Sequence, residues 1–173
     1  SKDLSKYYSV IYNGPRCGAS APDHLHFQAG NKFFMAIDDE FHQIKNEYGK
    51  VIYEDDDLSF YAIDDGVRKF VSIESLDKEL VVKTFNKFYK TYSKLINEEQ
   101  EPMINLVSFY EEEYGWRVII FLRAKHRPAV FFAEDESKML VSPAAIDLGG
   151  VCVFPREEDF NRITKKMIKE IFN

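Results

Sequence analysis

Short apolar runs separated by turn residues follow one another along most of the chain. Runs rich in β-branched and aromatic residues, or alternating between apolar and polar positions, predict strands. The glycines of Asp64-Asp65-Gly66 and Tyr114-Gly115 supply the positive φ of a tight turn, so each predicts a hairpin between the flanking strands. The predicted strands are 7–12, 24–29, 50–53, 58–63, 67–73, 105–111, 117–123, 129–133 and 151–154.

Two segments show helical signals instead. Ser75 is a candidate N-cap for a helix over about 76–96, where apolar residues recur near helical spacing. Pro155 ends the strand before it, and a terminal helix is predicted over 158–172. Between the early strands, 41–48 is a polar connection with room for one helical turn. The apolar stripe of the long helix consists of Leu80, Val81, Phe85, Phe88, Tyr92 and Leu95.

The predicted elements follow the order strands, long helix, strands, helix, with hairpin connections. This order is typical of an α+β fold with an antiparallel sheet, not of a doubly wound parallel sheet. We expect the long helix and the C-terminal helix to pack on that sheet. The 15 Phe, 10 Tyr and one Trp supply large side chains for this packing.

Composition narrows the classes of function. The chain has 173 residues, with 23 Lys and Arg against 29 Asp and Glu, and its net charge of -6 argues against nucleic-acid binding. No apolar run approaches the roughly 20 residues of a membrane span, and no secretory signal is visible. Cys17 and Cys152 are too few and too far apart for a disulfide framework or a zinc finger. We therefore expect a soluble cytoplasmic protein that binds neither nucleic acid nor membrane.

The sharpest chemical feature is the HxHxQ segment, which contains His24, His26 and Gln28. On a strand, alternation places these three side chains on one face. Imidazole is a competent nucleophile towards phosphorus because it is neutral and basic near pH 7. Two plainer readings are a surface strand with polar histidines and a metal-ligand pair. No third ligand lies at a suitable local spacing, so we expect no metal.

The segment 10–28 resembles the active-site segment of the histidine triad superfamily. The similarity is greatest to the HxHxQ branch, which contains galactose-1-phosphate uridylyltransferase, diadenosine tetraphosphate phosphorylase and GDP-L-galactose phosphorylase, the last being the most similar. The segment 142–150 also resembles the late apolar region of that phosphorylase. We expect a closer relation to an uncharacterised bacterial family of this superfamily.

This resemblance implies a role for each matching residue. His26 is the implied nucleophile that accepts a nucleotidyl group, His24 a structural partner bonded to backbone, and Gln28 a hydrogen-bond donor to phosphate. Asn13 matches the Asn that contacts the nucleotide. The spacing from Ser20 to His24 is one residue longer than in the uridylyltransferases. The resemblance implies no cofactor, and the other implied phosphate or nucleotide ligands are Arg16, Gly18, Ala19 and Ser20.

A second candidate site is the basic cluster Arg123, Lys125, His126 and Arg127. One interpretation is a solvated strand end. The other is an anion site, in which Arg grips phosphate bidentately and Lys adds a point charge. We hypothesise that the basic cluster lies near His24 and His26, within the chain or across a homodimer.

The two-half enzymes of this branch suggest a domain division. In that scheme 1–30 is the tail of a first half, 31–49 a connection and 50–173 the second half. The chain begins at Ser1 without Met, so we expect a fragment whose partner is the missing N-terminal half of the same protein. The expected function is a nucleotidyltransferase or nucleotide phosphorylase that forms a nucleotidyl-histidine from a nucleoside diphosphate sugar or a dinucleotide. The alternatives are a nucleotide-binding regulatory module and an interaction domain without catalysis.

Overall fold

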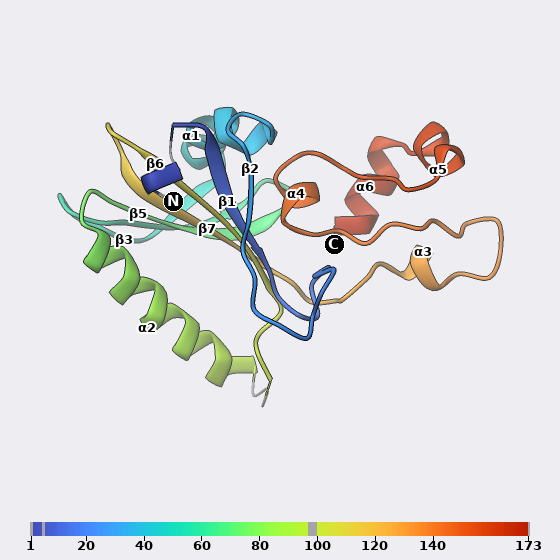
Figure 1. The fold of residues 1–173 in the computed structure, drawn as a ribbon, viewed down its shortest axis with the longest axis horizontal. Coiled ribbons are helices and arrows are strands. Elements are labelled where there is room, and N and C mark those ends of the chain that lie inside the picture. The colour runs from blue at the N-terminus through green and yellow to red at the C-terminus, as the bar shows by residue number, and fades with distance from the viewer. Residues whose placement is uncertain (1, 5, 97–99, 173) are drawn as a thin grey trace.

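One antiparallel sheet of seven strands organises the molecule (Figure 1). The computed structural model describes residues 2–4, 6–96 and 100–172. In this part of the chain the strand order is β2-β1-β6-β7-β5-β4-β3. The strands are β1 (Tyr8–Asn13), β2 (Gln28–Asn31), β3 (Gly49–Glu54), β4 (Ser59–Asp64), β5 (Lys69–Ser75), β6 (Ile104–Glu111) and β7 (Gly115–Leu122).

Helices pack on both faces of this sheet. The long helix α2 packs on one face, whereas α1 and α4 pack on the other (Figure 1). A third apolar cluster joins α6 to the segment around Met139 and Val141. The helices are η1 (Lys2–Leu4), α1 (Ala36–Tyr48), α2 (Lys78–Ile96), α3 (Ala129–Phe132), α4 (Ala145–Leu148), α5 (Glu157–Arg162) and α6 (Lys165–Phe172).

The predicted α+β class with an antiparallel sheet is confirmed. The hairpins β4–β5 and β6–β7 form where the turn glycines predicted them, with φ of 78° at Gly66 and 76° at Gly115. A Cβ at Gly115 would also lie 2.3 Å from the Ser75 carbonyl oxygen, so this position requires glycine on steric grounds too. The assignment of 1–30 to the tail of a first half stays a prediction. In this structure β1 pairs directly with β6 inside the common sheet.

The prediction of a polar connection over 41–48 is wrong, because α1 spans thirteen residues from Ala36 to Tyr48. Ile37, Phe41 and Ile44 recur at helical spacing and are buried against the sheet. The charged residues between them obscure this narrow apolar stripe in the sequence. Tertiary packing on the sheet therefore stabilises a helix that composition alone does not indicate.

Two predicted strands in the C-terminal third are also wrong. The segment 129–133 contains the short helix α3, and 151–154 has no regular structure. A strand needs a neighbouring strand to accept its hydrogen bonds. Here the Val151 N–H donates to the Ile146 carbonyl and the Val153 N–H to Asp147 Oδ1, so α4 satisfies these amides instead.

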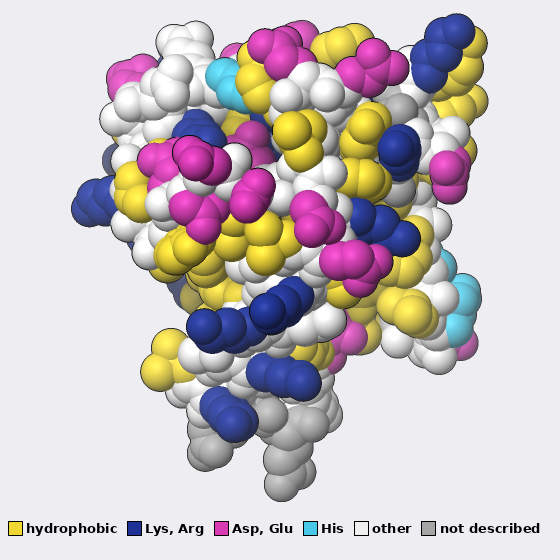
Figure 2. All heavy atoms as spheres, turned by 90° about the vertical axis from the view of Figure 1, so that its left-hand side faces the viewer, with side chains coloured by type: hydrophobic (Ala, Val, Ile, Leu, Met, Phe, Trp, Pro, Cys, Tyr) yellow, Lys and Arg dark blue, Asp and Glu magenta, His cyan; other side chains and the backbone are white. Residues whose placement is uncertain are grey.

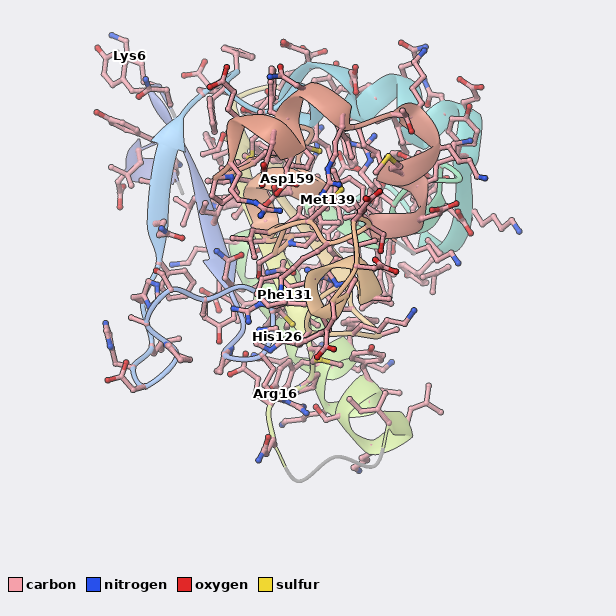
Figure 3. All side chains as sticks on the ribbon, turned by 90° about the vertical axis from the view of Figure 1, so that its right-hand side faces the viewer. Lys6, Arg16, His126, Phe131, Met139 and Asp159 are labelled. Atoms are coloured by element: carbon pink, nitrogen blue, oxygen red, sulfur yellow. The ribbon has the colours of Figure 1, made fainter. Side chains whose placement is uncertain are left out.

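The predicted terminal helix is divided into α5 and α6. Ile163 is extended, with φ of -63° and ψ of 140°. Thr164 Oγ1 then accepts a hydrogen bond from the Met167 N–H, as an N-cap does at a helix start. The buried Asp159 fixes α5, because it accepts hydrogen bonds from Arg156, Arg162 and the Leu140 N–H. In Figure 3, Asp159 lies beside Met139 in this C-terminal segment.

Charges of both signs lie close together on the face that carries α2. Figure 2 shows lysines of α2 below a band of Asp and Glu side chains. The exposed lysines of that helix include Lys83, Lys87, Lys90 and Lys94.

None of the described helices combines the length and apolar character that a membrane span requires.

Candidate active site

The sequence-predicted site residues gather at one end of the sheet. β1 ends there at Asn13, β2 begins at Gln28, and the register pairs Asn13 with Asn105 at the start of β6. β7 ends at the same edge, because Ile104 pairs with Leu122. The loop 14–27 and the segment after β7 therefore emerge side by side.

The prediction of a strand over 24–29 is only partly right. Strand pairing begins at Gln28, opposite Ile11, whereas 24–27 is irregular. β1 continues to Asn13, but its last two residues pair with β6 alone and not with residues before Gln28. His24 and His26 consequently lie on a loop rather than on a strand face. Their rings are nevertheless close, with centroids 5.2 Å apart.

A backbone carbonyl orients the ring of His26. Its Nδ1 lies 3.2 Å from the carbonyl oxygen of His24. A carbonyl can only accept a hydrogen bond, so Nδ1 carries the proton of the neutral ring and Nε2 keeps its lone pair. The ring of His24 instead contacts the Asp23 carboxylate, at 3.2 Å between Nδ1 and Oδ1. His24 is exposed and His26 is half-buried.

A chain of side-chain amides runs inward from Gln28; we call it the amide network. Asn13 Nδ2 donates to Gln28 Oε1 at 3.2 Å. Asn105 Nδ2 donates to Asn13 Oδ1 at 2.7 Å and to the Cys17 carbonyl at 2.7 Å. Arg123 Nη1 donates to Asn105 Oδ1 at 2.9 Å. The amide network therefore joins the HxHxQ segment to the basic cluster.

The members of the basic cluster differ in exposure. Arg123 is half-buried and also donates to the Pro143 carbonyl at 2.7 Å. Arg127 donates to Ser142 Oγ at 3.1 Å, and its guanidinium lies 4.2 Å from the centroid of the Phe131 ring. Lys125 and His126 are exposed. A cavity of about 170 Å³ is lined by Arg123, Lys125, Arg127, Lys69 and Glu170, among others.

Arg16 joins the basic cluster from the loop after β1. Arg16 and His126 lie near each other at the same end of the molecule, below Phe131 in the view of Figure 3. Burial lowers the pKa of His126, and the positive charges of Arg127, Arg123 and Arg16 lower it further. His126 is therefore predominantly neutral at pH 7, and the guanidinium groups supply the positive charge.

The small residues of the loop 14–27 let its backbone pack closely against the segment before α4. Gly18 has φ of 84°, and a Cβ there would lie 2.8 Å from the Ala144 Cβ. Glycine at this position thus lets the loop pack against the segment that precedes α4. Ala19 is half-buried and Ser20 is exposed. Among the described residues, no group of three or more His, Cys, Asp or Glu side chains is placed to hold a metal.

Sequence reasoning missed Asn105, the central member of the amide network. Asn105 is fully buried at the start of β6. Alternation puts it on the same face as Val107 and Phe109, which belong to the apolar core. An Asn at an inward position of an apolar strand is a signal of a satisfied polar network, because an unpaired buried amide is costly.

Comparisons with known proteins agree with the resemblance at the level of the family. Residues 1–31 match a domain of unknown function (DUF4922), and residues 45–173 match the GDPGP1-like, C-terminal domain. Neither the curated proteins nor the solved structures contained a match. The second family match covers most of the chain. The chain belongs to the GDPGP1-like C-terminal domain family, a family of nucleotidyl-transferring enzymes related to nucleotide-sugar phosphorylases.

Proposed function

We propose that the chain carries the nucleophilic histidine of a nucleotidyltransferase or nucleotide phosphorylase. The substrate class is a nucleoside diphosphate sugar or a dinucleotide. The observation that supports this most directly is the contact between His26 Nδ1 and the His24 carbonyl. It leaves Nε2 as the basic nitrogen of a half-buried ring two residues before Gln28, as nucleophilic attack on phosphorus requires.

The reaction consists of two displacements at the same phosphorus. His26 Nε2 attacks the α-phosphorus, a P–N bond forms, and the bond from this phosphorus to the bridging oxygen breaks. The leaving group is the phosphate-bearing remainder of the substrate. An oxygen of a second phosphate compound then attacks the α-phosphorus and breaks the P–N bond. Nucleotide is thereby transferred, and His26 returns to its neutral form.

The surrounding groups supply donors and positive charge. The Gln28 amide donates to a phosphoryl oxygen, and the backbone of Gly18 and Ala19 with the Ser20 hydroxyl adds further donors. Arg16 and the basic cluster favour the anionic substrate and its leaving group. The proposed role of the His24 side chain is secondary, because it is the backbone carbonyl of His24 that contacts His26.

Covalent labelling tests the proposed function. The full-length natural protein is incubated with α-³²P-labelled GDP-, UDP- or ADP-hexose, or with labelled diadenosine tetraphosphate, and the denatured protein is counted. We expect acid-labile label on His26 that is lost in His26→Ala. His24→Ala keeps the backbone carbonyl, so it should retain part of the label. His42→Gln is the matched control, since Gln can still accept the hydrogen bond from Arg117.

The alternatives give distinct results. Label that persists in His26→Ala contradicts the assignment of the nucleophile. Calorimetric binding of the same compounds without any label supports a nucleotide-binding regulatory module. No binding and no label support an interaction domain without catalysis.

A further inference from the structure

The hydrogen bond between Asn13 and Gln28 connects a buried residue to an exposed one. Asn13 is 8% exposed, whereas the side chain that it contacts belongs to an exposed residue. The bond runs from Asn13 Nδ2 to Gln28 Oε1 at 3.2 Å. A primary amide has one oxygen that accepts and one nitrogen that donates. The orientation of the Asn13 amide therefore decides which end of the Gln28 amide faces outward.

Groups that can only donate or only accept fix the orientation of Asn13. The backbone N–H of Ala145 donates to Asn13 Oδ1 at 2.8 Å, so this atom must be the oxygen. Asn105 Nδ2 donates to the same oxygen, and its own orientation is fixed from both ends. The Arg123 guanidinium, which has no acceptor, bonds Asn105 Oδ1, and the Cys17 carbonyl, which has no donor, bonds Asn105 Nδ2.

The consequence at the surface follows directly. With its oxygen occupied by Ala145 and Asn105, Asn13 has only its Nδ2 to offer to Gln28. Gln28 must accept with Oε1 and so presents its Nε2 group outward. A turned Gln28 would place two N–H groups against each other and lose the bond. The buried part of the network thus holds an exposed amide with its donor side towards solvent.

We propose that Asn13 is a positioning residue that orients Gln28 as a donor to a phosphoryl oxygen. This role differs from the nucleotide contact that the family resemblance implied for Asn13. The inference rests on the proposed function for the identity of the anion. The orientation of the Gln28 amide is a separate property that can be measured without any reaction.

Asn13→Asp reverses the direction of the hydrogen bond between position 13 and Gln28, and it keeps the side-chain volume nearly the same. One carboxylate oxygen still accepts from Ala145 and Asn105, but the other replaces the Nδ2 donor. Gln28 then turns, donates Nε2 to Asp at position 13 and presents Oε1 outward, which repels a phosphoryl oxygen. The matched control is Asn31→Asp, which adds the same charge to an exposed position of β2.

Hydrogen exchange of the ¹⁵N-labelled side-chain amides by NMR is the first readout. In the wild type both Nε2 protons of Gln28 should exchange at the rate of an exposed amide, and those of Asn105 should be protected. In Asn13→Asp one Gln28 proton should become protected, whereas Asn31→Asp should match the wild type. A Gln28 amide that is protected in the wild type, or unchanged by Asn13→Asp, overturns the proposal.

Calorimetric binding of GMP as the phosphate probe is the second readout. Asn13→Asp should weaken binding about tenfold, the scale of one lost hydrogen bond to a charged group, and Asn31→Asp less than about twofold. If Asn13→Asp does not fold, Gln28→Glu decides: it still accepts from Asn13, removes the outward donor and should weaken binding equally. Undiminished binding by Gln28→Glu overturns the proposal.

The two proposals can fail separately. Absence of covalent label together with the predicted exchange pattern contradicts the proposed function and supports the positioning role. Label on His26 together with an unchanged Gln28 amide in Asn13→Asp contradicts the positioning role alone.

Discussion

A hydrogen-bond network that contains an arginine lies at each end of β7, and the two networks differ in charge and in burial. At one end Arg117 is 3% exposed and pairs with Glu74, with Nη2 and Oε2 3.0 Å apart. Lys45 pairs with the other oxygen of Glu74 at 2.8 Å, and His42 Nε2 accepts from Arg117. At the other end, about 20 Å away at the usual rise of a strand, Arg123 begins the neutral amide network.

The network of Arg117 is internal to the scaffold, whereas the amide network reaches the surface at Gln28. The network of Arg117 consists of charges that neutralise one another, and Arg117 also stacks on Phe41 with its guanidinium carbon 3.9 Å from the ring centroid. It fixes α1 on the sheet. The amide network transmits only orientation, and it ends at the exposed Gln28. The buried charges join α1 to the sheet, whereas the proposed role of the buried amides is to orient the donor of Gln28.

The largest expected effect comes from breaking the charged network. Glu74→Ala leaves Arg117 and Lys45 without their carboxylate, and an uncompensated buried charge costs about 3–5 kcal/mol. The free energy of unfolding, measured by urea denaturation, should fall by that amount. Glu111→Gln is the matched control, because this partner of Arg117 is more exposed and should cost less than about 1 kcal/mol. A loss below about 1 kcal/mol in Glu74→Ala would show that the network is not structural.

The second effect concerns Asp38, a buried carboxylate outside both networks. Asp38 accepts from Ser9 and from the Phe33 N–H, and among the described residues its Oδ1 has no hydrogen-bond partner. Burial raises its pKa to about 6. The folded state therefore favours the protonated form, and the contribution of Asp38 to stability falls as pH rises from about 4 to 6. The shift corresponds to roughly 3 kcal/mol.

Asp38→Asn removes this titrating carboxyl group. It tests a buried carboxylate that forms no ion pair within the described part of the chain, in contrast to Glu74, which pairs with Arg117 and Lys45. The difference in unfolding free energy between the wild type and the variant should change by roughly 3 kcal/mol between pH 4 and pH 7, with the variant gaining relative to the wild type at the higher pH. The exposed Asn46 of α1 provides the control Asn46→Ala, which changes no titrating group and should give a flat difference. A flat difference for Asp38→Asn as well would contradict the assigned pKa.

The smallest expected effect comes from the amide network. Asn105→Ala leaves the Arg123 guanidinium and the Cys17 carbonyl each without one hydrogen-bond partner, which costs about 1–3 kcal/mol. Urea denaturation should show a smaller loss than in Glu74→Ala. The exposed Asn46 of α1 gives the control Asn46→Ala, where helix propensity slightly favours Ala. A loss as large as in Glu74→Ala would remove the distinction between the two networks.

Local pattern predicted most of the sheet and the longest helix. The apolar stripe of α2, the strands β3 to β7 and the turns at Gly66 and Gly115 follow from periodicity and from backbone conformation. These signals are short in range, so a sequence displays them directly. The HxHxQ segment was also visible, because its residue types carry the chemistry wherever the chain places them.

Only the tertiary structure decided which segments found partners. The residues 24–27, 129–133 and 151–154 have strand-like composition, but no neighbouring strand accepts their hydrogen bonds in the described part of the chain. A strand exists only as one member of a pair, whereas a helix bonds within itself. Even so, α1 depended on the sheet beneath it, because its three buried residues form a stripe too narrow to stand out in the sequence.

The amide network is the part of the site that sequence reasoning did not reach. Asn13, Asn105, Arg123 and Ala145 are far apart in the chain, and they meet because β1, β6 and β7 end at one edge of the sheet and α4 packs against it. The sequence determined that these residues can donate or accept. The register of the strands decided which donor meets which acceptor, because a hydrogen bond forms only within about 3 Å.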